Sequence, residues 1–348
     1  MAARTDWVEH LSVAEIAEIE AVSARICATQ AKLTQPDTVD HPLPTLAPRL
    51  RRILSDVLDG RGFVLLRGLP VQRWGQRQSA AAFMLIGAHF GNARPQNSQG
   101  HLLGHVKDMG LSSSDPAVRI YQTSERQTFH TDSCDIVGLL CLQTARSGGQ
   151  SALVSSTTLF NEMRRRRPDL AALLFQPLAT DRRGEVAPGQ RPFFSIPVFS
   201  WWPQGDTGQL SAIYQRQYID SAQRFAEAPR ITPEIRAALD LLDALTNDPA
   251  LHFLMSLEPG DIQLVHNHTL LHDRTAFDDW PEPERQRHLL RLWLAPVQAR
   301  ALPPVFAERY GSVVPGERGG VCLPSALLHA PLDARYPPHG NTLHAASR

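Results

Sequence analysis

An imidazole and a carboxylate stand two positions apart in one segment of the chain. They are His130 and Asp132, in the run Gln127-Thr128-Phe129-His130-Thr131-Asp132-Ser133-Cys134. Side chains alternate between the two faces of an extended strand, so we expect both groups on the same face. A neutral imidazole beside a carboxylate suits a first-row divalent metal ion. Such a pair is common by chance, and it predicts a metal site only if further ligands exist elsewhere.

Further candidate ligands lie far downstream. Three histidines, His266, His268 and His272, follow a turn at Gly260-Asp261 and a short apolar run. Two histidines and one carboxylate on one side of an ion leave three coordination positions open, which is the arrangement in non-haem Fe(II) oxygenases. All three histidines have even numbers, so the alternation along a straight strand does not select among them.

These and several other motifs occur in an order that resembles a known family. They are Gly62-Phe63-Val64-Leu65-Leu66-Arg67-Gly68, His130-Thr131-Asp132, Gly148-Gly149-Gln150-Ser151, Gly260-Asp261, Asn267 five residues before His272, His272-x-Arg274 and Arg287-His288-Leu289-Leu290-Arg291. Over residues 62–296 the chain resembles the TauD/TfdA family of Fe(II)- and 2-oxoglutarate-dependent dioxygenases (clavaminate-synthase-like). The resemblance implies that His130, Asp132 and His272 bind Fe(II). We expect the other two histidines to form hydrogen bonds near the site and Asn267 to fix the local backbone.

The cosubstrate that the resemblance implies, 2-oxoglutarate, is a dianion and needs a cation. A carboxylate in a water-poor pocket must be paired, and a planar guanidinium can pair it in bidentate fashion. The resemblance assigns this role to Arg287 and places the hydroxyl of Ser151 beside the same carboxylate. On a regular strand Arg291 would share a face with Arg287, where it could anchor the other end of the site or an anionic substrate. The alternative for either arginine is a structural ion pair.

The resemblance implies an enzyme with Fe(II), 2-oxoglutarate and O2 as cofactor and cosubstrates. It would couple release of succinate and CO2 from 2-oxoglutarate to oxidation, usually hydroxylation, of a small organic substrate. One alternative is a zinc or iron hydrolase in which His266, His268 and His272 activate water. Another is a non-catalytic barrel that binds a ligand. The hydrolase would depend on His266 and the dioxygenase on Asp132.

The elements that position these residues are mainly strands. Short apolar runs predict strands at 63–70, 136–144, 151–155, 253–257, 262–266 and 288–295. We expect helices near 80–90, after Thr157, and after Thr232-Pro233, where a cap precedes a proline. The resemblance implies a mainly β fold with helical insertions: a double-stranded β-helix (jelly roll) core flanked by helices.

We predict a single catalytic domain over residues 1–348. Residues 1–61 form a helical N-terminal segment that opens with a capping box at Ser12-Val13-Ala14-Glu15. Residues 62–296 form the dioxygenase core. Within the core, residues 180–217 are rich in Gly, Pro and aromatic residues, which predicts an irregular insertion that serves as a lid or a surface loop. Residues 297–348 are Pro-rich, and we expect them to wrap the surface.

The composition limits the partners of this protein. The 35 basic residues balance 35 acidic ones, and all the basic residues except Lys32 and Lys107 are arginines spread without a basic block. This argues against binding of nucleic acid or of anionic lipid. The four cysteines lack metal or redox spacing and are expected to be free thiols. Without a signal peptide or a long apolar run, we expect a cytoplasmic protein with a small-molecule substrate and no membrane partner; a homo-oligomer stays open.

Overall fold

Two β-sheets face one another at the centre of the computed structural model, which describes residues 5–29, 33–34, 36–113, 118–204 and 207–334. The strands of the larger sheet are β1 (Val8–His10), β2 (Phe63–Arg67), β3 (Asn92–Ala93), β4 (Leu103–Val106), β6 (Ile136–Gln143), β14 (Ile262–His266) and β17 (His288–Ala295). Those of the smaller sheet are β5 (Gln127–His130), β8 (Ser151–Ser155), β13 (His252–Met255) and β15 (Leu270–Arg274). The larger sheet has the order β1-β2-β14-β6-β17-β3, with β4 also paired to β17, and the smaller has the order β13-β8-β15-β5.

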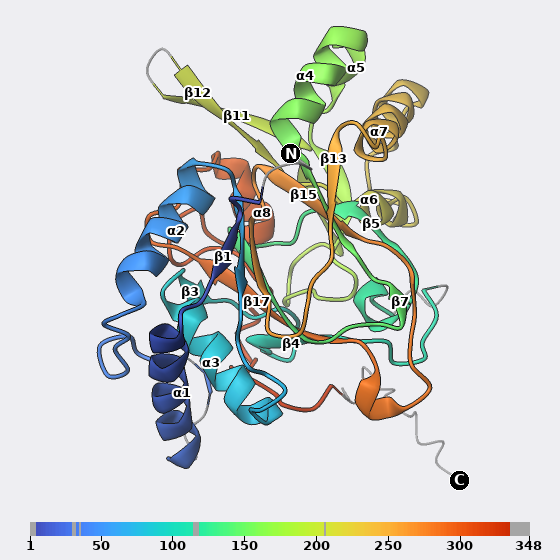
Figure 1. Cartoon of the computed structure of the whole chain (residues 1–348). Helices are drawn as coiled ribbons and strands as arrows, with labels where there is room; N and C mark the ends of the chain where they lie inside the picture. The colour runs from blue at the N-terminus through green and yellow to red at the C-terminus, as the bar shows by residue number, and fades with distance from the viewer. Residues whose placement is uncertain (1–4, 30–32, 35, 114–117, 205–206, 335–348) are drawn as a thin grey trace.

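Helices cover the outer face of the larger sheet. They are α1 (Val13–Ala28), α2 (Ala47–Asp59) and α3 (Gln76–Ala88), and their apolar residues share one core with those of β2, β14 and β17 (Figure 1). The predicted capping box is present: the Glu15 amide donates to Ser12 Oγ at 3.3 Å, and the Ser12 amide donates to Glu15 Oε2 at 2.7 Å. The described part of residues 1–61 contains the helices α1 and α2, and it also contains the short strand β1 of the larger sheet.

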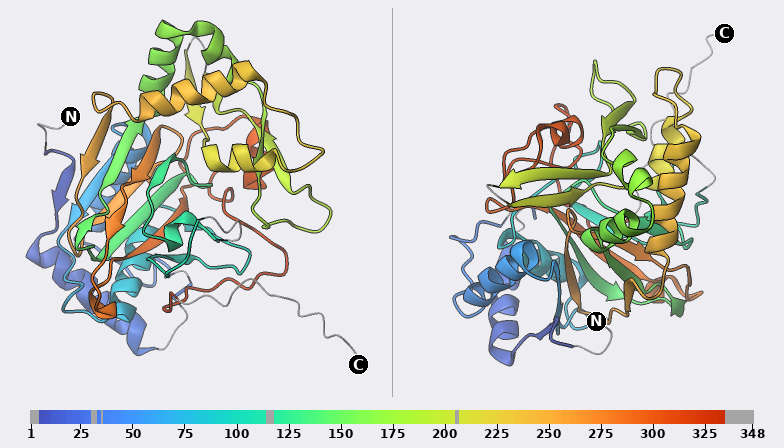
Figure 2. Two further views of the ribbon diagram at one scale, coloured as in Figure 1. Left: turned by 90° about the vertical axis from the view of Figure 1, so that its right-hand side faces the viewer. Right: turned by 90° about the horizontal axis from the view of Figure 1, so that it is seen from above.

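A second group of helices covers the outer face of the smaller sheet. It consists of α4 (Ser156–Arg166), α5 (Pro168–Leu173) and α7 (Pro233–Thr246), which lie above the smaller sheet in the left view of Figure 2. Phe129, Val154 and Leu271 of the sheet pack into the same apolar cluster as these helices. The predicted cap at Thr232 is present, because its hydroxyl accepts a hydrogen bond from the Ile235 amide at 3.2 Å.

The alternation along each strand decides which side chains reach the space between the sheets. Both faces of the sheets are covered, which explains the nearly continuous apolar runs in the sequence. In β17, Leu290 and Leu292 pack against the outer helices, whereas Leu289 and Arg291 line a cavity on the inner side. Polar residues at inner-face positions of these strands are therefore the candidates for a functional site.

More than half of the described residues in 180–217 lie in strands or a helix, so the prediction of an irregular insertion was wrong for that part. They contribute to two antiparallel hairpins, β9 (Leu178–Asp181) with β10 (Phe193–Ile196) and β11 (Phe199–Gln204) with β12 (Thr207–Ala212), and to the start of α6 (Arg216–Ala222). Each strand has only four to six residues. Pro203 is tolerated in β11 because a two-stranded ribbon leaves one edge of each strand free. The Trp201 side chain on this ribbon is 53% exposed.

Part of the C-terminal extension is buried, so the prediction that it wraps the surface was wrong for this part. Leu302, Phe306 and Tyr310 are buried around η3 (Pro304–Phe306) and α8 (Ala307–Tyr310), and Arg318 is 0% exposed. The prolines indicated a lack of long helices and strands, but the apolar residues between them still bury their side chains. Residues 335–348, which belong to the predicted Pro-rich extension, lie outside the described residues.

The remaining short elements are β7 (Ser147–Gly148) paired with β16 (Phe277–Asp278), and the 3-10 helices η1 (Ile120–Gln122) and η2 (Pro283–Arg285). Cys27, Cys134, Cys141 and Cys322 are free thiols, as expected. In the described part of the chain, no helix has both the length and the apolar character needed to cross a bilayer.

Candidate metal centre and adjoining cavities

Three potential metal ligands meet between the two sheets. His130 ends β5, and His272 lies opposite it on the paired strand β15. Asp132 follows just beyond β5, so the pair is not carried by one regular strand as expected, although both side chains still face the same point. Asp132 Oδ1 is 3.9 Å from His130 Nε2, and Asp132 Oδ2 is 3.8 Å from His272 Nε2. One donor atom from each residue lies within 4.8 Å of the others, which allows one ion to contact all three.

Both imidazoles are in the form that binds a metal. The Nδ1 atom of His130 lies 2.8 Å from the Thr128 carbonyl oxygen, so Nδ1–H donates there and Nε2 keeps its lone pair. The side-chain nitrogen Nε2 of Gln127 lies 2.8 Å from His130 Nε2 and can donate to it. Burial lowers the pKa of His130, and burial together with the neighbouring imidazole lowers the pKa of His272 to about 3. Both rings are therefore neutral at neutral pH.

The Asp132 carboxylate is ionised and held in place. Burial alone would raise its pKa, but Arg291, His272, His130 and the Trp293 indole keep the pKa below its usual value. Trp293 Nε1 donates to Asp132 Oδ2 at 2.9 Å, and Arg291 Nη1 lies 3.5 Å from the same oxygen. Trp293 was not among the residues predicted from the sequence, although it continues the two-residue alternation of Arg287 and Arg291.

Asn267 fixes the loop that carries Asp132. Its side-chain oxygen accepts from the Asp132 amide at 3.2 Å, and its side-chain nitrogen donates to the Cys134 carbonyl at 3.2 Å. Its own amide donates to the Asp135 carbonyl at 2.9 Å. These contacts agree with the structural role expected for this asparagine.

His266 and His268 lie apart from the three ligands. A turn separates His266, at the end of β14 in the larger sheet, from β15 in the smaller sheet, so the three histidines do not lie on one strand. His266 Nδ1 lies 3.2 Å from the Thr269 hydroxyl, and His268 Nε2 lies 2.8 Å from Asp135 Oδ1. This arrangement counts against the hydrolase alternative, because the three histidines do not form one centre.

Asp135 is the centre of a buried charge cluster next to the site. Arg318 Nη2 donates to Asp135 Oδ1 at 2.7 Å, and both side chains are fully buried. Burial alone would raise the pKa of Asp135, but His268 and Arg318 hold this pKa below its usual value. The cluster ties the C-terminal extension to the loop that also carries Asp132.

A cavity of about 430 Å³, here called the first cavity, opens on the three ligands. Its lining is Val106, Gln127, His130, Asp132, Val137, Leu139, Ser151, His272, Asp273, Arg274, Arg287, Leu289 and Arg291. The structure thus brings together every site residue predicted from the sequence: the three ligands, Ser151, Arg287 and Arg291.

Arg287 is a buried cation with capacity for a further partner. It is 4% exposed, and its Nη1 atom has no hydrogen-bond partner among the described residues. Burial lowers the pKa of Arg287 to about 10. Gly149, with φ of 69°, leaves room for it, because a Cβ at this position would lie 2.9 Å from Arg287 Nε. An unsatisfied guanidinium nitrogen in a buried cavity fits a carboxylate ligand.

Ser151 and Arg274 line the same part of the first cavity. The Ser151 hydroxyl donates to Gln263 Oε1 at 3.2 Å, and Arg274 Nη1 donates to the Thr123 carbonyl at 2.9 Å. Burial and the nearby Arg287 lower the pKa of Arg274 to about 9. The sequence pattern contained Arg274 only as a motif position, but its spacing of two from His272 already indicated the same strand face.

A second cavity, of about 480 Å³, adjoins the first. Its lining is Gln96, Arg119, Ile120, Tyr121, Gln127, Asp132, Ser133, Glu185, Gln215, Tyr218, Arg291, Trp293 and Arg309. The two cavities share Gln127, Asp132 and Arg291, so both adjoin the Asp132 carboxylate.

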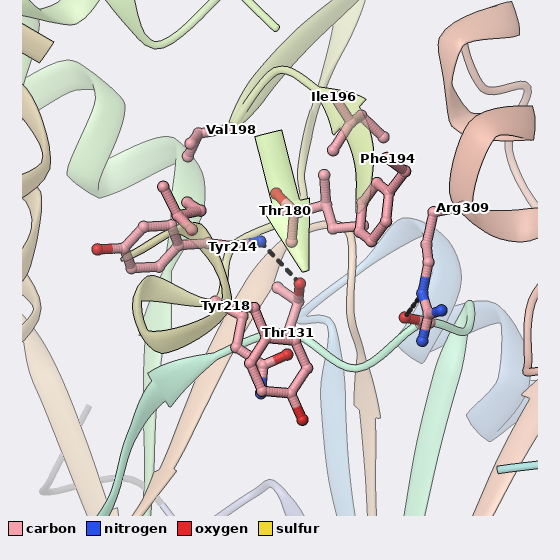
Figure 3. A pocket seen from close by; sticks show the side chains of 12 residues that line it. Thr131, Thr180, Phe194, Ile196, Val198, Tyr214, Tyr218 and Arg309 are labelled. Atoms are coloured by element: carbon pink, nitrogen blue, oxygen red, sulfur yellow. Dashed lines mark hydrogen bonds between the residues drawn. The ribbon is translucent and has the colours of Figure 1, made fainter. Parts of the chain in front are cut away.

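A third cavity, of about 380 Å³, continues from the second toward the two hairpins, and the two share Ser133, Gln215, Tyr218 and Arg309. Figure 3 shows this cavity. The Tyr214 amide there donates to the Thr131 hydroxyl at 2.9 Å, which ties the insertion to the residue between His130 and Asp132.

The chain is similar to known proteins over most of its length. A family model described as "Taurine catabolism dioxygenase TauD, TfdA family" matches residues 29–293. The chain belongs to the TauD/TfdA family. It is 30% identical to "FR-33289 synthase" of Streptomyces rubellomurinus (strain ATCC 31215) over 314 residues, which cover 88% of this chain and 91% of that protein. It is 32% identical to a "Uridine-5'-phosphate dioxygenase" of Amycolatopsis sp over 201 residues, 54% of this chain and 70% of that one.

The fold is also that of a solved oxygenase structure. An asparagine oxygenase in complex with Fe(II), 2S,3S-3-hydroxyasparagine and succinate superimposes with a TM-score of 0.64 and 17% identity, covering 83% of this chain and 93% of that one. The predicted jelly-roll fold and family are confirmed. As a member of the family, the protein is an Fe(II)- and 2-oxoglutarate-dependent dioxygenase that uses O2 to oxidise a small molecule, with release of succinate and CO2.

Proposed function

We propose that His130, Asp132 and His272 hold the Fe(II) and that Arg287 binds the distal carboxylate of 2-oxoglutarate. This proposal rests on one observation: two neutral imidazoles, one carboxylate and the buried Nη1 atom of Arg287 line the same cavity. The donor set is the one preferred by non-haem Fe(II) oxygenases. When bound, the iron and 2-oxoglutarate together supply the activation of O2.

The remaining cavity residues orient these groups. The Ser151 hydroxyl lies on the strand paired with β15, from which it can add a hydrogen bond to the carboxylate held by Arg287. Arg291 is anchored by Gln96 Oε1, 2.7 Å from its Nε, and faces Asp132. This position supports a role at the end of the cosubstrate near the metal, where Arg291 also holds Asp132 ionised.

The substrate enters by the second cavity. Asp132 borders both cavities, so a molecule in the second cavity lies beside the metal ligands without displacing the cosubstrate from the first. The polar lining, and the small polar molecules in the names of related proteins (uridine-5'-phosphate and hydroxyasparagine), support hydroxylation of a small polar substrate. A cytoplasmic location and the lack of nucleic-acid and membrane partners stay predictions, and a homo-oligomer stays open.

The test is reconstitution of the full chain with Fe(II) and 2-oxoglutarate under anaerobic conditions, followed by addition of O2. We expect 2-oxoglutarate to bind and succinate to form slowly even without a substrate. Asp132→Ala should remove succinate formation, whereas His266→Ala should keep it. Loss of activity in His266→Ala with retention in Asp132→Ala would refute the ligand assignment, and absence of cosubstrate binding in the wild type would refute the whole proposal.

A further inference from the structure

We propose that Arg309 binds an oxyanion of the substrate, a carboxylate or a phosphate. The inference rests on the proposed function, because it takes the second cavity as the substrate site. Arg309 belongs to α8 in the C-terminal extension, beyond the residues 29–293 that match the family model. It therefore lies outside the residues that the family model matches.

Arg309 lies where the second and third cavities meet. Its Nε donates to the Ser133 hydroxyl at 2.7 Å, and Ser133 directly follows the proposed ligand Asp132. Its guanidinium carbon is 5.5 Å from the centre of the Phe194 ring. Figure 3 shows the side chain extending past Phe194 toward the level of Thr131. These two contacts hold the cation at a fixed position relative to the metal ligands.

The charges of the second cavity leave Arg309 unbalanced. Arg119 forms an ion pair with Glu185 at 3.1 Å, and Arg291 faces Asp132 at 3.5 Å. Within the described ranges, no carboxylate lies at ion-pair distance from Arg309. A cavity whose other charges are matched, and which keeps one free guanidinium, attracts an anion.

Arg309 also has donors available for such a ligand. A guanidinium carries five N–H donors, and the bond to Ser133 uses the one on Nε. Across the described part of the chain, no acceptor is within hydrogen-bond distance of Nη1 or Nη2 of Arg309. Two terminal nitrogens that face a cavity in a planar fork match the two oxygens of a carboxylate or phosphate.

The test measures binding in the full chain with Mn(II) in place of Fe(II), which prevents turnover. Saturating 2-oxoglutarate is added first, so that Arg287 is occupied. Butyl phosphate, pentanoate and pentanol are then titrated by calorimetry into the wild type, Arg309→Gln and Arg182→Gln. Arg182 is the matched control, because its guanidinium also lies over Phe194, at 5.3 Å, and donates to the Glu308 carbonyl, but it lines neither the second nor the third cavity.

In the wild type and in Arg182→Gln, we expect at least one anion to bind about tenfold or more tightly than pentanol. Arg309→Gln should weaken binding of the anion about 10- to 100-fold, which corresponds to the loss of one charge-assisted hydrogen bond, and should leave binding of pentanol unchanged. The stronger of butyl phosphate and pentanoate identifies the oxyanion. The inference would be overturned if the wild type bound all three probes equally or bound neither anion. It would also be overturned if Arg309→Gln weakened the binding of all three probes equally. If the wild type failed to bind 2-oxoglutarate in the first step, the proposed function would fail instead.

Discussion

Replacing Arg287 by methionine should separate the stability of this protein from its ability to bind 2-oxoglutarate. Burial is the main cause of the lowered pKa of Arg287, which falls from 12.5 to about 10. At 1.36 kcal/mol per pKa unit, holding this cation in the folded protein costs about 3 kcal/mol. At pH 7 the guanidinium is protonated in both the folded and the unfolded chain. The cost is therefore present at pH 7 and is relieved only as pH rises through about 10.

Arg287→Met removes the charge and keeps a long side chain at the buried position. Without cosubstrate, we expect the free energy of unfolding to equal that of the wild type or to exceed it by up to about 3 kcal/mol. With Mn(II) and 2-oxoglutarate at about 100 times its dissociation constant, the wild type should gain about 2.7 kcal/mol and the variant almost nothing. Urea unfolding of the full chain, with and without 2-oxoglutarate, measures both quantities.

Arg291→Met serves as the control. Arg291 donates to Gln96 and faces Asp132, so its loss leaves a buried carboxylate unpaired and should destabilise the protein by about 3–5 kcal/mol. The reasoning on Arg287 would be refuted if the free energy of unfolding of Arg287→Met, without cosubstrate, were lower than that of the wild type by more than about 1 kcal/mol. It would also be refuted if 2-oxoglutarate still stabilised the variant.

Trp293→Phe removes the hydrogen bond to Asp132 and should lower the affinity for Fe(II) about tenfold, as measured by competition with a chelator. Unchanged affinity would exclude a role of the indole in metal binding. Gly149→Ala places a Cβ against Arg287 at a residue with positive φ, which should strain the backbone by about 1–2 kcal/mol. We expect the KM for 2-oxoglutarate to rise roughly tenfold in a succinate assay, and an unchanged KM would contradict this. Asp135→Asn should cost about 3–5 kcal/mol in urea unfolding at neutral pH. Because the wild-type pKa of Asp135 is lowered, this difference should shrink only below pH 3.8, and a difference independent of pH would count against the ion pair.

Local patterns predicted the strands of the core well. The strands predicted at 262–266 and 288–295 coincide with β14 and β17, because each is an apolar run with a turn or proline at its end. Arg287, just before β17, and Arg291 within it were expected to share a face, and both line the first cavity. Spacing alone left the choice of the second histidine open, since the turn that moves the chain from one sheet to the other has no periodic signal.

Contacts between distant segments could not be predicted from the sequence. Trp293 contacts Asp132, 161 positions away, and no local feature of an apolar strand indicates that an indole N–H meets a carboxylate. Arg309 and Arg318 lie in a segment whose prolines suggested only a surface course. Their positions depend on Ser133 and Asp135, which the fold brings to them from the middle of the chain.

The ion pair between Asp135 and Arg318 also bears on when the site is completed during synthesis. The two residues are 183 positions apart. At about 5–20 residues per second, a ribosome adds Arg318 about 10–40 s after Asp135. Until then the loop that carries Asp132 also carries a carboxylate without its buried counter-charge. If His130, Asp132 and His272 bind iron as proposed, the loop that carries Asp132 reaches its final charge balance only after residue 318 has been made, and we expect tight iron binding only after that point.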